Sequence, residues 1–180
     1  MVRRDRTQMV RGKRLFLDKL SDTDASVTYM GWLNDPLTNQ FLESRYSSAT
    51  LESLSGFIET CNGDPDLHLF GIFELESGRH VGNIKLGPVD TKHHHGDIGL
   101  IIGEKDCWGK GYATEAIQLI CEFAFLTLKL HKVTASMYAE NTNSYKAFIK
   151  AGFNREGLLR QHMWLEDHYS DKILMGKLYR

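Results

Sequence analysis

The segment from residue 96 to residue 138 constrains the fold of this chain more than any other part of it. Gly96–Ile102 is rich in β-forming residues, and over about Gly111–Leu130 apolar side chains recur at helical spacing. Lys132–Tyr138 then returns to a strand pattern. Two strands joined through a helix lie parallel in one sheet, because the chain must cross back over that sheet before the second strand begins.

The other segments predict a sheet that is otherwise antiparallel, since short turns join most of its strands. A first strand begins near Arg14, a helix capped at Ser21 or Asp22 follows through Trp32, and a second helix covers about Thr50–Cys61. The remaining predicted elements are the strands Leu67–Leu75, Val81–Leu86, Gly157–Leu165 and Ser170–Leu178 and the helix Asn143–Ala151. The expected fold is therefore α/β (α+β), a mixed, mostly antiparallel twisted sheet of about seven strands flanked by about four helices.

Composition limits the class of protein and its partners. The chain has 180 residues, 42% of them hydrophobic, and no linker-like stretch, so a single domain over residues 1–180 is expected. A formal net charge of −1 gives no reason to expect nucleic acid or an anionic membrane as a partner. Residues 1–13 are rich in arginine and are predicted to form a flexible basic tail.

The cysteine content and the distribution of apolar residues suggest a location. Cys61, Cys107 and Cys121 are odd in number and widely spaced, so they predict neither a disulfide framework nor a metal site. No apolar run resembles a secretory signal or a membrane span. A cytoplasmic protein is expected.

A glycine-rich turn, Trp108–Thr114, lies between the strand and the helix of the crossover. Glycines there allow a tight bend and leave backbone amides exposed at a helix N-terminus, which suits a pyrophosphate. A P-loop would need Ser or Thr after Lys110, where Gly111 stands, and a dinucleotide fingerprint would need glycine at Thr114. Both are excluded, and a purely structural turn remains the alternative.

Two motifs resemble those of the GNAT superfamily of N-acetyltransferases, in the branch near the ribosomal-protein N-terminal acetyltransferases and their amino-sugar relatives. Residues 108–116 read Trp-Gly-Lys-Gly-Tyr-Ala-Thr-Glu-Ala, with Trp108 where the superfamily motif has Gln or Arg. The second motif runs from Asn141 through Ala147-Phe148 to Ala151-Gly152-Phe153. The similarity covers nearly the whole chain from about Arg14.

The resemblance implies acetyl-CoA as the cosubstrate and no metal. It assigns the pantetheine arm to the end of one strand, the pyrophosphate to the glycine-rich turn, and the region near the thioester to Asn141. The positions it marks for the cosubstrate are Ile101, Ile102, Gly103, Trp108, Gly109, Lys110, Gly111, Tyr112, Ala113, Thr114, Asn141, Asn143, Ser144 and Phe148.

Acetylation requires a neutral amine, whereas a lysine-type amine has a pKa of ~10.4, so a proton acceptor is expected. Asp97 matches a glutamate of many superfamily members, with a hairpin-capping role as the alternative. Glu43 is the second candidate, with a solvated loop charge as its alternative. Ser144 matches a serine proposed to protonate the leaving thiolate, or else it caps the following helix. Phe148 stands where many members have a tyrosine.

The acceptor is the least determined feature. Met163 stands where the ribosomal-protein enzymes have a glutamate, so the expected acceptor is a small amine such as the amino group of a nucleotide-linked sugar. Protein N-termini and polyamines are alternatives within the enzyme class, and a non-catalytic acetyl-CoA-binding module is the alternative outside it. Strict alternation would put His162 on one face with Arg160 and Trp164, beside the acceptor pocket or on the surface.

Two further expectations concern the histidine run and the strand edges. His93, His94 and His95 are predicted to form a hydrated hairpin, because consecutive side chains point in alternating directions and do not converge on one ion. Exposed strand edges near the C-terminus could pair two copies into a homodimer.

Overall fold

The structure, a computed structural model, describes residues 10–180. The basic residues before position 10 lie outside that range. Val10–Arg11 form a short strand, β1, which pairs with β2, Leu15–Lys19. Val10 is buried, so the predicted flexible tail does not extend through residues 10 and 11.

All eight strands described belong to one sheet, in the order β1-β2-β3-β4-β5-β6-β8-β7. Neighbouring strands are antiparallel except for β5 and β6, which are parallel, as the crossover predicts. The mixed, mostly antiparallel sheet is confirmed, with β1 as a strand beyond the predicted seven. The other strands are β3 His68–Glu74, β4 His80–Asp90, β5 His95–Ile102, β6 Lys132–Tyr138, β7 Asn154–Leu165 and β8 His168–Leu178.

The described helices depart from prediction mainly at their ends. The first one, α1, begins at Val27 with Ser26 as its cap, because the residues after Ser21 form only a 3₁₀ turn. The long crossover helix is α-helical only to Glu122 and continues as a π-helical turn over Phe123–Thr127. The helices are α1 Val27–Asn34, α2 Pro36–Asn39, α3 Leu51–Gly63, α4 Tyr112–Glu122 and α5 Thr142–Lys150, and a 3₁₀ turn, η2, covers Glu43–Tyr46.

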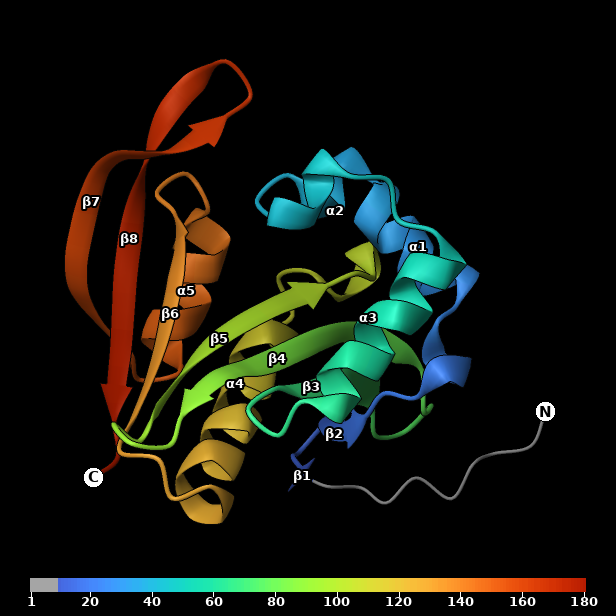
Figure 1. The fold of residues 1–180 in the computed structure, drawn as a ribbon, viewed down its shortest axis with the longest axis horizontal. Helices are drawn as coiled ribbons and strands as arrows, with labels where there is room; N and C mark the ends of the chain where they lie inside the picture. Colours follow the sequence, from blue (N-terminus) through green and yellow to red (C-terminus); the bar gives the residue numbers. More distant parts are fainter. Residues whose placement is uncertain (1–9) are drawn as a thin grey trace.

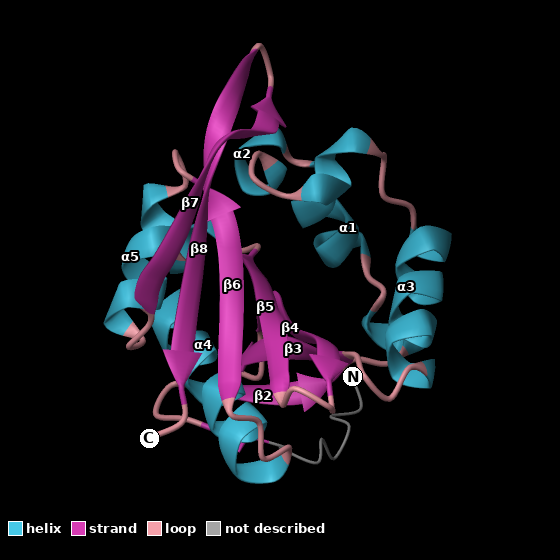
Figure 2. Cartoon of the chain, turned by 60° about the vertical axis from the view of Figure 1, so that its left-hand side comes forward, coloured by secondary structure: helices cyan, strands magenta, loops and turns pink. Residues whose placement is uncertain are grey.

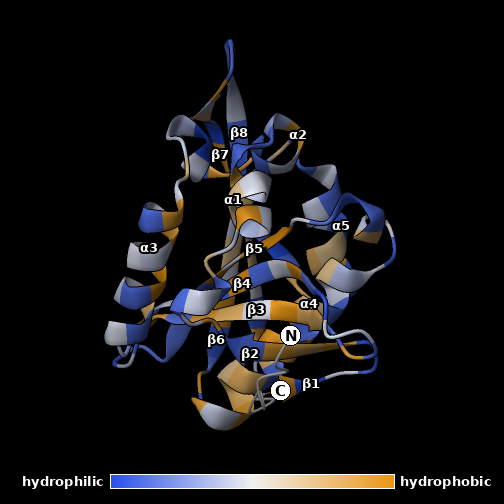
Figure 3. Cartoon of the chain, turned by 90° about the vertical axis from the view of Figure 1, so that its right-hand side faces the viewer, coloured by the Kyte–Doolittle hydropathy of each residue, from blue (hydrophilic) through white to orange (hydrophobic). Residues whose placement is uncertain are grey.

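Helices cover both faces of the sheet (Figure 2). The larger core cluster joins α4 and α5 to one face, through residues such as Ile98, Ile117 and Phe148. The smaller cluster joins α1 and α3 to the other face, through residues such as Trp32 and Ile58. In Figure 3 the hydrophobic residues follow β2 and β3 and the side of α3 that faces the sheet, as burial of one helix face requires.

Strands β5 and β6 are paired only at their beginnings. Their last paired residues are Asp97 and Thr134, although β5 continues to Ile102 and β6 to Tyr138. Beyond that point the two strands diverge, β5 toward α1 and β6 toward α5 (Figure 1). The sheet therefore opens at its middle, with the glycine-rich turn at one side of the opening and α5 at the other.

The C-terminal hairpin of β7 and β8 completes the sheet. β7 is an edge strand, and most of its residues are exposed. Pairing of two copies through this edge, the predicted homodimer, stays a prediction. No helix within residues 10–180 has both the length and the apolar character needed to cross a membrane.

Candidate active site

A cavity of about 370 Å³ occupies the opening between β5 and β6. Its wall brings together three regions that are distant in sequence: the end of β5, the glycine-rich turn and the first turns of α5. The segment after α1 forms its fourth side. The lining residues are Leu37, Thr38, Gln40, Phe41, Leu42, Leu100, Ile101, Ile102, Cys107, Trp108, Gly109, Gly111, Tyr112, Ala113, Thr114, Asn141, Asn143, Lys146, Ala147 and Lys150. A larger hollow of about 580 Å³ between α4 and the C-terminal strand has none of the predicted site residues in its described wall.

The glycine-rich turn has the backbone that an anion site requires. Gly109 and Gly111 have φ angles of 72° and 82°, a left-handed conformation that glycine adopts without strain. Gly111 is the N-cap of α4, so the amides that follow it lie at the positive end of the helix. The Trp108 indole Nε1 donates to the carbonyl of Ile102 at 2.8 Å, which fastens the turn to the end of β5.

The end of β5 offers a free backbone edge to the cavity. Leu100, Ile101 and Ile102 pair with β4 on one side, and β6 has already diverged on the other. Apart from the Ile102 carbonyl, which accepts from Trp108, the backbone amides and carbonyls on that edge are thus available to an extended ligand, which can add to the sheet like a further strand.

The α5 wall is polar and positively charged. The Asn141 Oδ1 accepts the backbone N–H of Ser144 at 3.2 Å and so caps the helix, which leaves its amide group at the cavity. Lys146 and Lys150 also line the cavity, one and two turns further along α5. Sequence reasoning missed both lysines, although helical spacing from Asn143 would have found them.

Four of the predicted cosubstrate positions are not in the cavity wall. Gly103 packs under Trp32, and the carbonyl of Lys110 accepts from Arg14 at 2.7 Å. Phe148 is 2% exposed and packs in the core, 4.9 Å from Phe153 by ring centroids. Ser144 is half-buried on α5, and its backbone N–H is capped by Asn141; the predicted cap at Ser144 is wrong, because Asn141 performs that role.

Asp97 lies at the point where β5 and β6 separate. It is exposed, and its Oδ1 accepts the hydroxyl of Thr134 on β6 at 2.8 Å. The hairpin before it is capped instead by Asp90, which accepts the backbone N–H groups of Lys92 and His93. Asp97 is therefore not the hairpin cap, and it lies outside the described cavity wall.

Glu43 belongs to a polar cluster that joins η2 to the end of β6. The buried Tyr138 hydroxyl donates to Glu43 Oε1 at 2.8 Å and accepts from Arg45 at 2.8 Å. Burial and the Glu43 carboxylate raise the pKa of Tyr138 to about 12, so this hydroxyl stays protonated near neutrality. Arg45 also donates to the carbonyl of Trp164 at 2.8 Å, and Phe41, a cavity residue, lies 5.9 Å from the Tyr138 ring.

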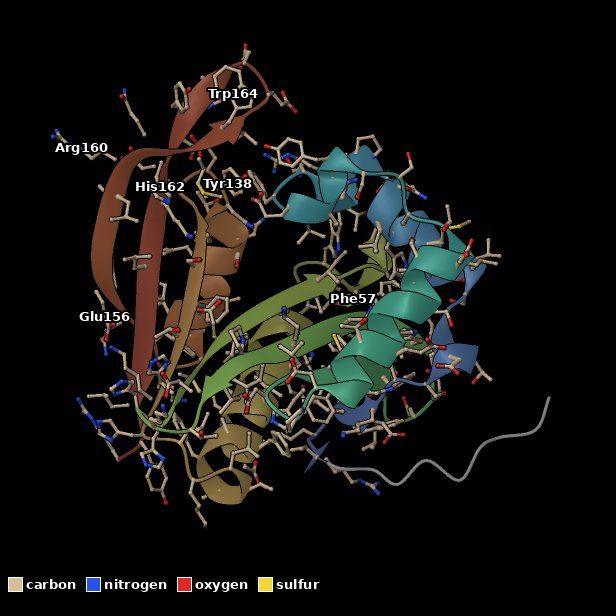
Figure 4. All side chains as sticks on the ribbon, viewed as in Figure 1. Phe57, Tyr138, Glu156, Arg160, His162 and Trp164 are labelled. Atoms are coloured by element: carbon tan, nitrogen blue, oxygen red, sulfur yellow. The ribbon has the colours of Figure 1, made fainter. Side chains whose placement is uncertain are left out.

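His162 lies in an irregular stretch of β7, where strict alternation does not decide which face a side chain is on. A bulge interrupts the β7–β8 register between Leu159 and Met163, and Gln161 there has a φ of 49°. Gln161 donates its backbone N–H to Asp171 at 2.8 Å, which stabilises the bulge. Figure 4 shows Arg160 projecting from the outer edge of the hairpin, whereas His162 lies over the strands on the side of Tyr138.

Comparison with known proteins identifies the family. The family model for the acetyltransferase (GNAT) domain matches residues 14–154. The Bacillus subtilis protein named "Probable N-acetyltransferase YjcK" is 30% identical over 181 residues, covering 94% of this chain and 97% of that protein. Spermidine N(1)-acetyltransferase of Escherichia coli is 29% identical over 98 residues, which cover 54% of this chain and 52% of that enzyme.

A solved structure has the same fold. The spermidine N-acetyltransferase of Vibrio cholerae, in complex with CoA and spermine, superposes with a TM-score of 0.82 at 20% identity, covering 93% of this chain and 96% of that one. The resemblance found in the two sequence motifs is confirmed. The chain belongs to the GNAT family of acetyltransferases and is an N-acetyltransferase, an enzyme that transfers an acetyl group to an amine.

Proposed function

We propose that the acetyl donor is acetyl-CoA and that it binds in the cavity between β5 and β6. The observation that carries this proposal is the meeting, in one cavity wall, of a free strand edge and a glycine-rich turn at a helix N-terminus. A pantetheine arm, with its amide groups, suits the strand edge, and a pyrophosphate suits the turn. Lys146 and Lys150 add positive charge beside a ligand that carries several phosphate charges.

The residues at the turn fit such a ligand. A Cβ at Gly109 would meet no atom within 4 Å, so the space beside the turn is open, and Gly111 is crowded only by Arg14 at 3.5 Å. Acetyl-CoA, when bound, supplies the thioester. Asn141, at the junction of β6 and α5, lies where it can contact the donor beside the diverging strands.

For the proton of the amine, Glu43 is the acceptor that the contacts favour over Asp97. Its cluster with Tyr138 adjoins the cavity residue Phe41, and the Tyr138 hydroxyl holds its carboxylate in place at 2.8 Å. Asp97 is engaged by Thr134 at the base of the opening. Ser144 remains the predicted proton donor to the thiolate, without support from the cavity wall.

The proposed acceptor is a small primary amine that reaches the cavity from the side of η2. A carboxylate at the rim, Glu43, attracts a protonated amine before that amine loses its proton. Spermidine acetyltransferases are among the relatives, so a polyamine is tested beside the nucleotide-linked amino sugar that the sequence led us to expect.

The test combines CoA binding, measured by calorimetry, with release of free thiol from acetyl-CoA. The amine panel contains spermidine, a nucleotide-linked amino sugar and a peptide with a free N-terminus. Turnover on either small amine, with little on the peptide, supports the proposal. Turnover on the peptide alone contradicts the proposed acceptor, and failure to bind CoA contradicts the proposed donor.

A further inference from the structure

Arg14, just before β2, touches the glycine-rich turn 96 residues away in sequence. Its Nη1 donates to the carbonyl oxygen of Lys110 at 2.7 Å. Its guanidinium also lies 4.9 Å from the centre of the Tyr112 ring, within the range of a cation–π contact. Arg14 is thus in contact with the turn although it is not among the residues that line the cavity.

Glu115, on the first turns of α4, holds Arg14 in place. It accepts the Arg14 side-chain Nε at 2.9 Å and the backbone N–H groups of Arg14 and Leu15 at 2.7 and 3.1 Å. Although burial acts to raise the pKa of Glu115, these donors bring it below its ordinary value, so the carboxylate stays ionised. The guanidinium is therefore fixed at two of its nitrogens, one on Glu115 and one on Lys110.

The contact with Lys110 sets the direction of the next amide. In a planar trans peptide the carbonyl and the following N–H point in opposite directions. Since the Lys110 carbonyl points to Arg14, the N–H of Gly111 points away from Arg14, and both Gly109 and Gly111 line the cavity. Glycine at position 111 offers little resistance to rotation of this peptide, so a contact from outside the turn is needed to fix it.

We propose that Arg14 is a positioning residue that locks the Lys110–Gly111 peptide with its N–H facing the cavity, ready to bind the pyrophosphate of the donor. The inference rests on the proposed function, because it assumes that this ligand occupies the cavity. This role also explains how Lys110 belongs to the motif without lining the cavity, because its backbone carbonyl is the group that Arg14 holds.

The experiment compares two donors, acetyl-CoA and S-acetylpantetheine, which lacks the pyrophosphate. Arg14→Ala should raise the KM for acetyl-CoA and the Kd for CoA about tenfold, the effect of about one charge-assisted hydrogen bond. The kcat should stay within about twofold, because no reacting atom is touched. With S-acetylpantetheine the variant should match the wild type.

Two further variants complete the design. Arg14→Lys keeps the charge but presents one flexible nitrogen where arginine holds Glu115 and Lys110 with two fixed ones, so it should recover only part of the affinity. Lys132→Ala is the control. It removes another exposed ion pair, in which the Lys132 Nζ lies 2.6 Å from Glu156, and the KM values for both donors should stay unchanged. Thermal unfolding of each variant verifies that the protein is folded.

Three results would overturn the inference. Equal losses with both donors would make Arg14 a general stability residue. Full recovery in Arg14→Lys, with a steep dependence on salt, would mean that the charge acts on the phosphates directly. Unchanged CoA affinity in Arg14→Ala would refute the lock alone, whereas a wild-type protein that does not bind CoA would refute the proposed function as well.

Discussion

Gly103→Ala tests how closely α1 is fitted to the end of β5. A methyl group at position 103 would lie 1.9 Å from the Trp32 ring, far inside van der Waals contact. The indole cannot turn away freely, because it is 5% exposed, its Nε1 donates to Glu104 at 2.9 Å, and His80 lies 5.0 Å away by ring centroids. The backbone at Gly103 is not left-handed, so the cost comes from the collision alone.

The collision should be costly because a rigid ring and a helix must shift. Overpacking of this kind costs ~1–3 kcal/mol, and we expect the upper end, about 3 kcal/mol. For a protein of this size, each kcal/mol of lost unfolding free energy lowers the Tm by ~2–4 °C, so the expected decrease in Tm is about 6–12 °C. Gly99→Ala, within the strand β5 that Gly103 follows, is the matched control: its Cβ would meet nothing within 4 Å, and a change within ~0.5 kcal/mol is expected.

Urea and thermal unfolding of the two variants and the wild type provide the measurement. Equal midpoints for Gly103→Ala and Gly99→Ala would refute the reasoning, since only one of the two positions is crowded. CoA affinity of the folded fraction adds a second readout. If Gly103→Ala lost affinity while keeping its stability, Gly103 would act as a ligand contact, as the sequence predicts, and not as a packing residue.

Three further predictions follow from the site and its surroundings. Lys150→Ala should weaken CoA binding severalfold, most at low salt, whereas Lys92→Ala on the distant hairpin should not; equal effects in calorimetry would contradict this. Glu43→Gln should lower kcat about 10²-fold with CoA affinity unchanged, and a larger loss in Asp97→Asn would transfer the proton-acceptor role to that residue. Nearby carboxylates, first Asp167 and then Glu140, raise the pKa of His168; the resulting stability is fully present below about pH 6.5 and is lost as pH rises through the folded-state pKa. In thermal unfolding from pH 5 to 8, the Tm of His168→Gln should lack the decline that the wild type shows. The same pH dependence of Tm in both proteins would contradict this prediction.

Local patterns were sufficient for much of the fold and of the candidate site. The parallel crossover and the glycine-rich turn each depend on residues close together in sequence, so their physical causes can be recognised in the chain itself. The ends of the helices were harder to predict from local patterns. Ser21 and Ser26 are both good cap residues, and only the observed hydrogen bond from the Tyr29 N–H shows that Ser26 starts α1.

Contacts between distant segments could not be predicted from the sequence. The Arg14–Lys110 and Glu43–Tyr138 hydrogen bonds join residues 96 and 95 positions apart, and no local pattern relates their partners. The bulge at Gln161 was also hidden, because a left-handed φ at a glutamine has no glycine to mark it. Alternation along β7 therefore does not decide the face of His162.

The sequence by itself determined the class of fold, the GNAT family and most of the segments that line the cavity. Those follow from periodicity, glycine conformation and helix ends, which act over a few residues. Only the tertiary structure decided which motif residues face the cavity, since Lys110 and Phe148 lie within the motifs but point elsewhere. It also decided which groups surround Glu43, because the return of the chain through η2 brings the Tyr138 hydroxyl at the end of β6 to that carboxylate and to the Arg45 guanidinium.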